Sequence, residues 1–152
     1  MIALDAFDKS ILRALSHDGR MTHTALSETV NLSPNAVAER IKRLQRDGVI
    51  EGFGVRLSAK ALGKTLLVFI EVKLDRTSAD VFDAFSAAAA KTSEIEECHM
   101  VAGGFDYLIK TRHADMAAFR RFLSDTLLSL PGIRETHTYA VMEEVKASAT
   151  TV

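Results

Sequence analysis

The sequence contains a single cysteine, Cys98, and no tryptophan among its 152 residues. One cysteine cannot build an internal disulfide framework, and such sparse use is typical of proteins from a reducing cytoplasm. No apolar run approaches the ~18 consecutive residues of a membrane-spanning helix. The first residues, Met1–Leu4, offer neither the basic region nor the apolar region of an export signal. These absences predict a cytoplasmic protein of one or two small domains with no membrane partner.

Motifs that carry covalent chemistry are also missing. The sequence has no G-x-S-x-G nucleophile motif, no P-loop and no dinucleotide-binding fingerprint. Cys98 and His99 are adjacent, and neighbours in a strand point to opposite faces of a sheet. Together with His113 and His137 they show neither CxxC nor HxxxH spacing. We therefore expect no metal site, no cofactor and no catalytic residues.

Charge is nearly balanced over the whole chain but not along it. The sequence has 19 Lys and Arg against 20 Asp and Glu. Residues 1–60 hold nine of these cations and seven of the acids, so the N-terminal part is the more basic one. Four of the nine cations lie within one short stretch, namely Arg40, Lys42, Arg43 and Arg46. Basic charge focused on one segment favours contact with the phosphates of a nucleic acid.

The segment Thr22–Arg46 (THTALSETVNLSPNAVAERIKRLQR) predicts two short helices joined by a tight turn. Thr22 is expected to cap the first helix, because its hydroxyl oxygen can accept a hydrogen bond from a free backbone N–H. Asn31 takes the turn, where a left-handed residue is often needed and asparagine tolerates that conformation. Ser33 and Pro34 suit the start of the second helix, since serine caps it and proline has no N–H to lose.

The second of these helices, expected over Pro34–Arg46, has one apolar and one polar face. Val37, Ile41 and Leu44 recur at helical spacing and predict a buried stripe. The candidate DNA-contacting residues of the helix and its cap are Ser33, Asn35, Ala36, Glu39, Arg40, Lys42, Arg43 and Arg46. A helix with a buried stripe and a mostly basic outer face, set after a helix and a turn, is how a recognition helix enters the DNA major groove. The same pattern also fits a packing motif whose basic face is only solvated.

The rest of the N-terminal part predicts a first helix and a β-rich end. Apolar residues at helical spacing indicate an amphipathic helix ending near Asp18; they are Leu4, Phe7, Ile11, Leu12 and Leu15. Val49–Leu57 (VIEGFGVRL) is rich in β-forming residues and predicts a wing or a short strand. Residues 1–57 are therefore expected to form a winged or three-helix unit of the helix-turn-helix type. Residues 58–64 (SAKALGK) are expected to be a linker.

After the linker the pattern predicts a βαββαβ order. Strands are expected over 65–74, 94–102, 105–112 and 133–145, with helices from Thr77 or Ser78 to about Lys91 and from Asp115 to Leu130. Residues expected to face the sheet are Phe82, Phe85, Ala89, Met116, Phe119, Leu123, Leu127 and Leu130. Gly103-Gly104 predicts a tight hairpin turn. The order is the ferredoxin-like one, so the fold class is α+β, with a second domain over 65–146 and a frayed tail over 147–152.

Four segments of the chain resemble the Lrp/AsnC (feast/famine) family of transcription regulators. They are LDAFDKSILRAL, then LSPNAVAERIKRLQRDGVI, then ECHMVAGGFDYLIKTR with ETHTYAVMEEVK. The resemblance is strongest to leucine-responsive members and implies a regulator of amino-acid metabolism that binds double-stranded operator DNA. It also implies that the second domain forms homodimers, that dimers often assemble into octamers, and that an amino acid binds at the seam between dimers. The chain has Asn31 where many members have glycine, and it lacks their SPTPC motif, so no base preference is carried over.

The resemblance places an effector loop at Gly103–Asp106. Glycines leave backbone N–H groups open to an α-carboxylate, and the Asp106 carboxylate can pair with an α-ammonium. The implied effector-binding residues are Gly103, Gly104, Phe105, Asp106, Tyr107, Met116, Leu128, Tyr139, Ala140 and Val141. By periodicity alone, most of these residues are core and Gly103-Gly104 is hairpin chemistry. The expected effector is a small aliphatic amino acid, leucine first, with proline, methionine, lysine and the other branched-chain amino acids left open.

Two other functions fit part of the sequence. One is a nucleoid-type architectural protein that compacts DNA without an effector. The other is an enzyme, because ferredoxin-like α+β domains also form dimeric barrels that act on small molecules. The helix-turn-helix segment and the missing catalytic cluster argue against the enzyme. The predicted role is therefore a cytoplasmic, nucleoid-associated transcription regulator of amino-acid metabolism that binds DNA sequence-specifically and responds to a small amino acid.

Overall fold

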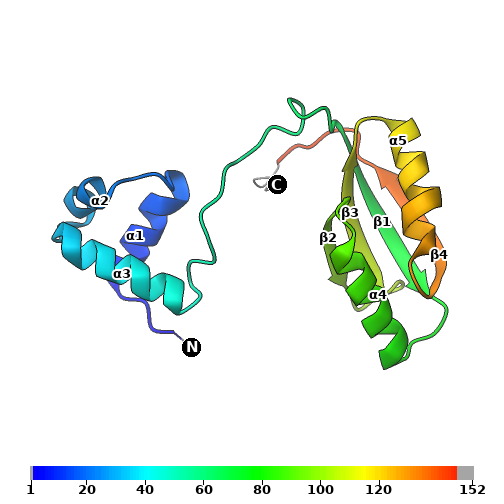
Figure 1. Ribbon diagram of the computed structural model, residues 1–152, viewed down its shortest axis with the longest axis horizontal. Helices are drawn as coiled ribbons and strands as arrows, with labels where there is room; N and C mark the ends of the chain where they lie inside the picture. The colour runs from blue at the N-terminus through cyan, green and yellow to red at the C-terminus, as the bar shows by residue number, and fades with distance from the viewer. Residues whose placement is uncertain (1, 147–152) are drawn as a thin grey trace. The chain divides into compact units, whose positions relative to one another are not determined.

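The computed structural model describes residues 2–146, so the predicted tail at 147–152 lies outside the described residues. The chain divides into two compact units, one ending at Arg56 and the other beginning at Leu57 (Figure 1). Among the described residues, no helix combines the length and the apolar character needed to cross a membrane.

The N-terminal unit is built from three helices, α1 (Ala6–His17), α2 (His23–Val30) and α3 (Pro34–Arg46). The predicted caps are confirmed. The Thr22 hydroxyl accepts a hydrogen bond from the Ala25 N–H at 3.2 Å, and Asn31 is left-handed with φ 54°. The Ser33 hydroxyl likewise accepts from the Ala36 N–H at 3.2 Å, with Pro34 in the first helical position. These local contacts fix the start of α3.

A small apolar core holds the three helices together. Its buried members are Ile11, Leu26, Val30, Val37 and Ile41. Val37, Ile41 and Leu44 are the buried residues of α3, as their spacing predicted. Because this stripe faces α1 and α2, the opposite side of α3 is left to solvent.

The strand predicted over Val49–Leu57 is not formed. The N–H groups of Val49 and Ile50 both donate to the Leu44 carbonyl, at 2.8 and 3.0 Å, and so close the end of α3. The chain beyond Ile50 has no regular structure up to residue 57. A strand needs a partner for its backbone hydrogen bonds, and residues 2–56 contain no other strand. The β-rich composition therefore gives an extended, exposed segment in the single chain.

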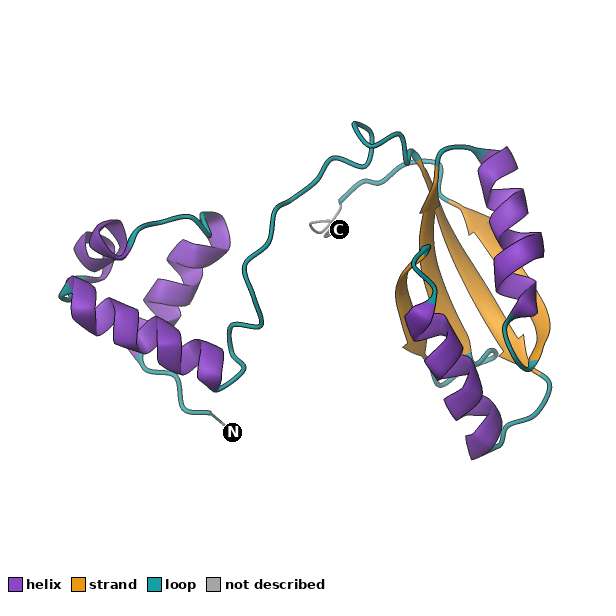
Figure 2. Cartoon of the chain, in the orientation of Figure 1, coloured by secondary structure: helices purple, strands orange, loops and turns teal. Residues whose placement is uncertain are grey.

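The C-terminal unit is a four-stranded antiparallel sheet with two helices. Its elements are β1 (Leu66–Leu74), α4 (Ala79–Lys91), β2 (Ile95–Met100), β3 (Tyr107–His113), α5 (Met116–Arg121) and β4 (Ile133–Ala140). The strand order is β2-β3-β1-β4, and both helices cover the same face of the sheet (Figure 2). The predicted ferredoxin-like arrangement is confirmed.

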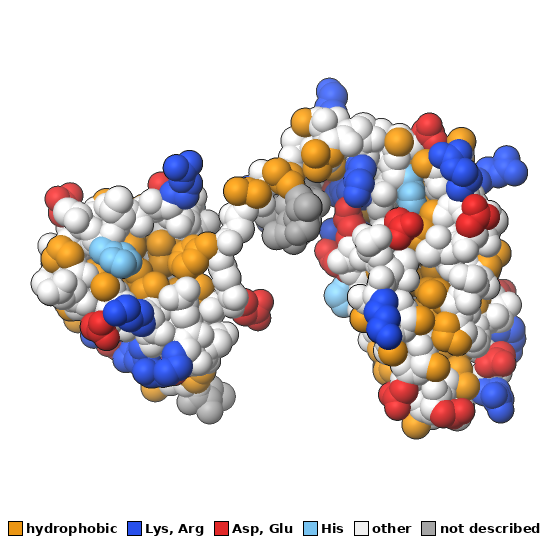
Figure 3. Space-filling model, in the orientation of Figure 1, with side chains coloured by type: hydrophobic (Ala, Val, Ile, Leu, Met, Phe, Trp, Pro, Cys, Tyr) orange, Lys and Arg blue, Asp and Glu red, His pale blue; other side chains and the backbone are white. Residues whose placement is uncertain are grey.

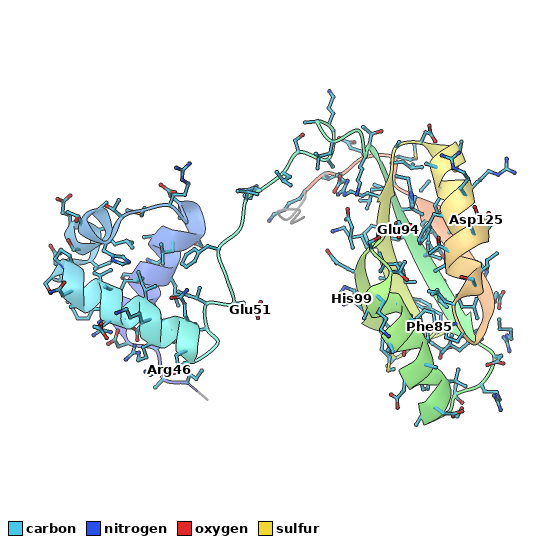
Figure 4. The ribbon with its side chains drawn as sticks, viewed as in Figure 1. Arg46, Glu51, Phe85, Glu94, His99 and Asp125 are labelled. Carbon is cyan, nitrogen blue, oxygen red and sulfur yellow. The ribbon has the colours of Figure 1, made fainter. Side chains whose placement is uncertain are left out.

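The core of this unit lies between the helices and the sheet. Every second residue of β1 faces it, namely Val68, Ile70, Val72 and Leu74. Phe85 of α4 is fully buried against these side chains (Figure 4). The alternate residues of β1 lie on the other face of the sheet, which no helix covers within the described part of the chain. This helix-free face is called the open face below.

The helix predicted over 115–130 changes its hydrogen-bonding pattern twice. It is an α-helix only to Arg121, a π-helix over Phe122–Thr126 and a 3₁₀ turn over Leu127–Ser129. A π-turn widens the helix and shifts every later residue around its axis. The expectation that Met116 faces the core is wrong, since it is 51% exposed; it lies at the start of α5, before the π-turn. Within the π-turn, Phe122 is buried. A strict 3.6-residue period cannot detect such a shift.

The predicted strand ends are wrong in two places, at the connection between β2 and β3 and at the end of β4. The connection between β2 and β3 runs over 101–106 and is closed by the Val101 N–H, which donates to the Asp106 carbonyl at 2.9 Å. Neither Gly103 nor Gly104 has the positive φ that a two-residue type I′ turn requires. β4 ends at Ala140 instead of Val145: the Val141 N–H still donates to the Leu67 carbonyl at 2.9 Å, in register with the β1–β4 pairing, and the chain leaves the strand after it.

Candidate functional site

The exposed face of α3 carries a row of polar side chains. Asn35, Glu39, Lys42 and Arg46 all lie on it, opposite the buried stripe. Arg46 extends from the last turn of the helix (Figure 4). Gln45 is exposed on the same side and was missed, although its position three residues after Lys42 places it there. At the start of the helix, the Ser33 hydroxyl and the Ala36 N–H are hydrogen-bonded to each other in the N-terminal cap.

Arg40 and Arg43 differ from the other predicted contacts, because both are held by acids of the same unit. Arg40 Nη1 donates to Asp5 Oδ2 at 2.7 Å and to Asp8 Oδ1 at 2.8 Å. Arg43 Nη2 donates to Asp8 Oδ2 at 2.5 Å. The Arg40 guanidinium also lies 5.4 Å from the centre of the Phe7 ring. In this structure the two arginines connect α3 to the start of α1.

Asp8 is the centre of this acidic cluster and is only 1% exposed. It forms a capping box with Asp5: the Asp8 N–H donates to Asp5 Oδ1 at 2.8 Å, and the Asp5 N–H donates to Asp8 Oδ2 at 3.1 Å. The Asp8 backbone N–H and then the Arg40 guanidinium lower the pKa of Asp5, which keeps it ionised. One buried carboxylate thus caps α1 and docks α3.

The two remaining cations of α3 are more available. Lys42 contacts Glu39 at 3.1 Å and Arg46 contacts Asp47 at 3.1 Å, both in water-exposed pairs. Acidic and basic side chains are seen next to each other on the surface of this unit (Figure 3). Exposed pairs of this kind contribute little to stability and are easily exchanged. Lys42 and Arg46 can therefore leave their acids for a phosphate at small cost.

The second group of candidates lies in the C-terminal unit, at the end of the sheet where β1 finishes. Asp106 Oδ2 accepts a hydrogen bond from the Leu74 N–H at 2.7 Å, at the point where the β1–β4 register shifts. The Asp106 N–H donates to the Val72 carbonyl at 2.9 Å. The carboxylate is thus fixed by the backbone, and no hydrogen bond to its Oδ1 is formed by residues 2–146.

The predicted effector residues next to Asp106 differ in their burial and in their contacts. A Cβ added to Gly103 or Gly104 would meet no atom within 4 Å, so a larger residue would fit at either position. Neither residue has a positive φ, so the backbone of the single chain does not require glycine there. Phe105 is half-buried. Tyr107 is buried, and its hydroxyl pairs with the Ser86 hydroxyl at 2.9 Å, so it belongs to the core, as periodicity alone predicts.

The remaining candidates are not gathered around Asp106. Tyr139 and Ala140 pair with Phe69 and Val68 near the start of β1, whereas Tyr107 pairs with Val72 near its end. At about 3.3 Å per residue, Phe69 and Val72 alone are about 10 Å apart along the strand.

The candidates on the α5 segment are divided between the same two ends. Met116 follows β3 and lies at the end of the sheet that holds Tyr139, where the Val141 N–H also donates to the Leu67 carbonyl. Leu128 is exposed and precedes β4, at the end of the sheet that holds Asp106. One chain therefore presents two separate groups of effector candidates.

The described part of the chain contains no candidate metal site. Residues 2–146 contain no group of three or more His, Cys, Asp or Glu side chains placed to hold a metal ion. Burial raises the pKa of the Cys98 thiol, which makes it a poorer metal ligand at neutral pH.

Comparison with known proteins identifies both units. Residues 4–51 match the winged helix-turn-helix DNA-binding family, and residues 67–151 match the Lrp/AsnC ligand binding domain. The chain belongs to the Lrp/AsnC family of transcription regulators. It is 51% identical over 145 residues to the leucine-responsive regulatory protein of Salmonella typhimurium, covering 95% of this chain and 88% of the relative. The protein of that name from Escherichia coli K12 is 50% identical over the same shares.

Solved structures of transcription regulators agree with this assignment. A transcriptional regulator from Neisseria meningitidis, crystallised as an L-Met complex, has a TM-score of 0.89 at 35% identity and covers 99% of this chain and 96% of its own. An AsnC family regulator from Agrobacterium tumefaciens has a TM-score of 0.90 at 26% identity, over 98% and 96%. The resemblance drawn from the sequence is confirmed. Because the relatives are regulators, the family also sets the enzyme alternative aside.

Proposed function

We propose that this Lrp/AsnC regulator binds double-stranded operator DNA as a homodimer, with α3 in the major groove. The observation that carries the proposal is the capped α3 helix, which buries one apolar stripe and exposes Asn35, Lys42 and Arg46. One such helix covers too little DNA for tight binding. A dimer would place two of them about 34 Å apart, which is one turn of the duplex. Binding to chromosomal DNA would locate the protein at the nucleoid in the cytoplasm.

The proposal includes an amino-acid effector bound between dimers. The Lrp/AsnC ligand binding domain and the L-Met complex of the Neisseria relative support it. So does the division of the candidates: a site at a seam between copies could join the Asp106 end of one chain to the exposed Met116 or Tyr139 of another. Leucine is the favoured effector, with methionine next, and the proposed assembly is an octamer of four dimers. An architectural protein without effector remains the alternative.

Lys42→Ala and Arg46→Ala are each expected to flatten the salt dependence of DNA binding. Each lost phosphate contact lowers the slope of log K against log salt by about 0.9. Fluorescence anisotropy with a selected operator, over a series of KCl concentrations, measures this slope. Arg43→Ala is the matched comparison: it should leave the slope nearly unchanged and lower stability instead, because Arg43 is engaged with Asp8.

Asn35→Ala should act on sequence preference in the same titrations. Asparagine near the start of a recognition helix can bind adenine through two hydrogen bonds, and a good bidentate contact contributes ~1–3 kcal/mol of discrimination. We expect the ratio of operator to random-DNA affinity to fall while the salt slope stays the same. If the Asn35, Lys42 and Arg46 variants all bind like the wild type, α3 does not enter the groove.

The C-terminal unit is expected to dimerise without the DNA-binding unit. It has its own core of strands and helices, so residues 61–152 should fold alone. Multi-angle light scattering on this fragment should give a dimer or larger at micromolar concentration. A fragment ending at Ala59 should be monomeric and bind DNA poorly. A monomeric C-terminal fragment would contradict the proposed architecture.

A further inference from the structure

Beyond β4 the chain crosses the end of the open face where β1 begins, from Leu67 on β1 to Arg112 on β3. This segment, residues 141–146, is called the strap. Its first hydrogen bond runs from the Val141 N–H to the Leu67 carbonyl at 2.9 Å. Three residues later the Glu144 carboxylate reaches past β1 to Arg112 on β3. Leu67 lies on the open face but is buried, and together with Val141 and Val145 it lines a groove of about 590 Å³ beneath the strap.

The contact between Arg112 and Glu144 has the geometry of a strong pair. Arg112 Nη1 donates to Glu144 Oε2 at 2.8 Å and Nη2 donates to Oε1 at 2.6 Å, so both carboxylate oxygens are held. The Arg112 side chain is 5% exposed, and its Nε lies 3.4 Å from the Glu96 carboxylate. The Glu144 carboxylate raises the pKa of Arg112, and the guanidinium lowers the pKa of Glu144. Both groups are therefore charged at neutral pH.

Little else holds the strap. Among residues 2–146, its hydrogen bonds to the sheet are the one from Val141 and the two to Glu144. The side chains of Met142 and Val145 are almost fully exposed and make no compensating core. The Arg112–Glu144 pair is only partly buried, because the Glu144 side chain is 33% exposed, and ion pairs open to water contribute little net stability. Its consequence is thus expected in the position of the strap rather than in the stability of the domain.

We propose that Arg112 and Glu144 form a latch that positions Tyr139–Val141 for the amino-acid effector. This rests on the proposed function, in which those residues contact the effector. Tyr139 and Ala140 are fixed by their pairing with β1. Val141 lies just beyond the strand and is fixed by Leu67 on one side and by the latch on the other. Arg112 is a positioning residue, since it acts through the strap.

Without the latch, Val141 would keep one backbone hydrogen bond near the end of a strand, where chains open most readily. Effector binding would then have to order the strap. The apparent Kd would equal the intrinsic Kd divided by the fraction of chains whose strap is already ordered. An ordered fraction of about one tenth gives a tenfold weaker apparent Kd.

The test compares full-length variants by calorimetry with L-leucine and L-methionine. Glu144→Gln and Arg112→Lys are expected to raise the apparent Kd about tenfold, since glutamine loses the charge and lysine cannot make the bidentate contact. Glu144→Asp, which keeps the charge, should recover part of the affinity. Glu97→Gln is the matched control: its carboxylate pairs with Lys110 of β3 at 2.6 Å and lines the same groove, but it makes no hydrogen bond or ion pair with residues 141–146, so the Kd of this variant should stay at the wild-type value.

Light scattering and thermal unfolding separate the alternatives. The latch predicts weaker effector binding with an unchanged oligomer and unchanged DNA affinity in the absence of amino acid. Wild-type effector affinity in both latch variants would overturn the latch and leave the proposed function standing. Affinity lost together with the oligomer would also overturn it, because the pair would then hold the assembly. No binding of either amino acid by the wild type would overturn the effector proposal and the latch together.

Discussion

Asp8→Ala is expected to lower the free energy of unfolding of the N-terminal unit by about 3 kcal/mol. The substitution removes a buried carboxylate that binds Arg40, Arg43 and the Asp5 N–H at once. Arg43 would lose its acidic partner, and α1 would lose half of its capping box, a change that typically costs ~0.5–2 kcal/mol by itself. Urea unfolding followed by far-ultraviolet circular dichroism measures the loss, since the chain has no tryptophan.

Asp47→Ala is the matched control for this substitution. Asp47 also pairs with an arginine of α3, Arg46, but the pair is exposed to water. Exposed pairs contribute ~0–1 kcal/mol, so this variant should unfold close to the wild type. Equal stability of the Asp8 and Asp47 variants would show that burial of the cluster has no energetic consequence and that α3 is docked by its apolar stripe alone.

The sequence predicts best what is decided within a few neighbouring residues. The Thr22 and Ser33 caps and the left-handed Asn31 are set by contacts within about one helical turn, and the stripe of α3 shows in the spacing of its apolar residues, so all of these could be predicted from the sequence. The βαββαβ order was predictable for a similar reason, because each element carries its own apolar period.

Contacts between distant parts of the chain could not be predicted from the sequence. The four cations of α3 look alike in the sequence, yet Arg40 and Arg43 flank the buried stripe and meet acids 32 and 35 residues away. Lys42 and Arg46 point to solvent instead. Only the packing of α1 against α3 separates an arginine that docks a helix from one that is free for DNA.

The candidate effector site shows a different limit. Glycine at 103 and 104 signals a hairpin to any sequence-based argument, but the structure neither needs their backbone freedom nor crowds them. Their connection to an amino acid came from family resemblance alone. A single chain leaves the Asp106 and Tyr139 groups at opposite ends of the sheet. Residues that act together only across an assembly cannot be grouped from one chain or its sequence.

This separation also constrains how an effector can act. A ligand shifts an equilibrium only by its difference in affinity for the two states. If the amino acid contacts two copies of the chain, it favours the assembly that brings those copies together. DNA binding by α3 would then respond through the number and spacing of recognition helices, without any change inside the N-terminal unit.

Asp106→Asn is expected to weaken amino-acid binding by one to two orders of magnitude. Losing a charge-assisted hydrogen bond to the α-ammonium costs about 1.5–3 kcal/mol, and each ~1.4 kcal/mol is tenfold in affinity. The fold should survive, because the asparagine oxygen can still accept the Leu74 N–H that Asp106 Oδ2 accepts at 2.7 Å. DNA affinity without effector should stay near the wild-type value, since the recognition helix lies in the other unit.

Calorimetry with L-leucine and L-methionine, on the wild type and on two variants, decides the role of Asp106. Asp75→Asn is the control, because Asp75 is an exposed carboxylate that lines the same hollow as Asp106, whereas the backbone N–H of Leu74 at the β1–β4 bulge is bonded by Asp106. If Asp106 pairs with the ammonium, only the Asp106 variant loses affinity. Equal losses in both variants would indicate a general effect of negative charge near the site. Wild-type affinity in the Asp106 variant would mean that its carboxylate serves only the Leu74 backbone and that the ammonium is bound elsewhere.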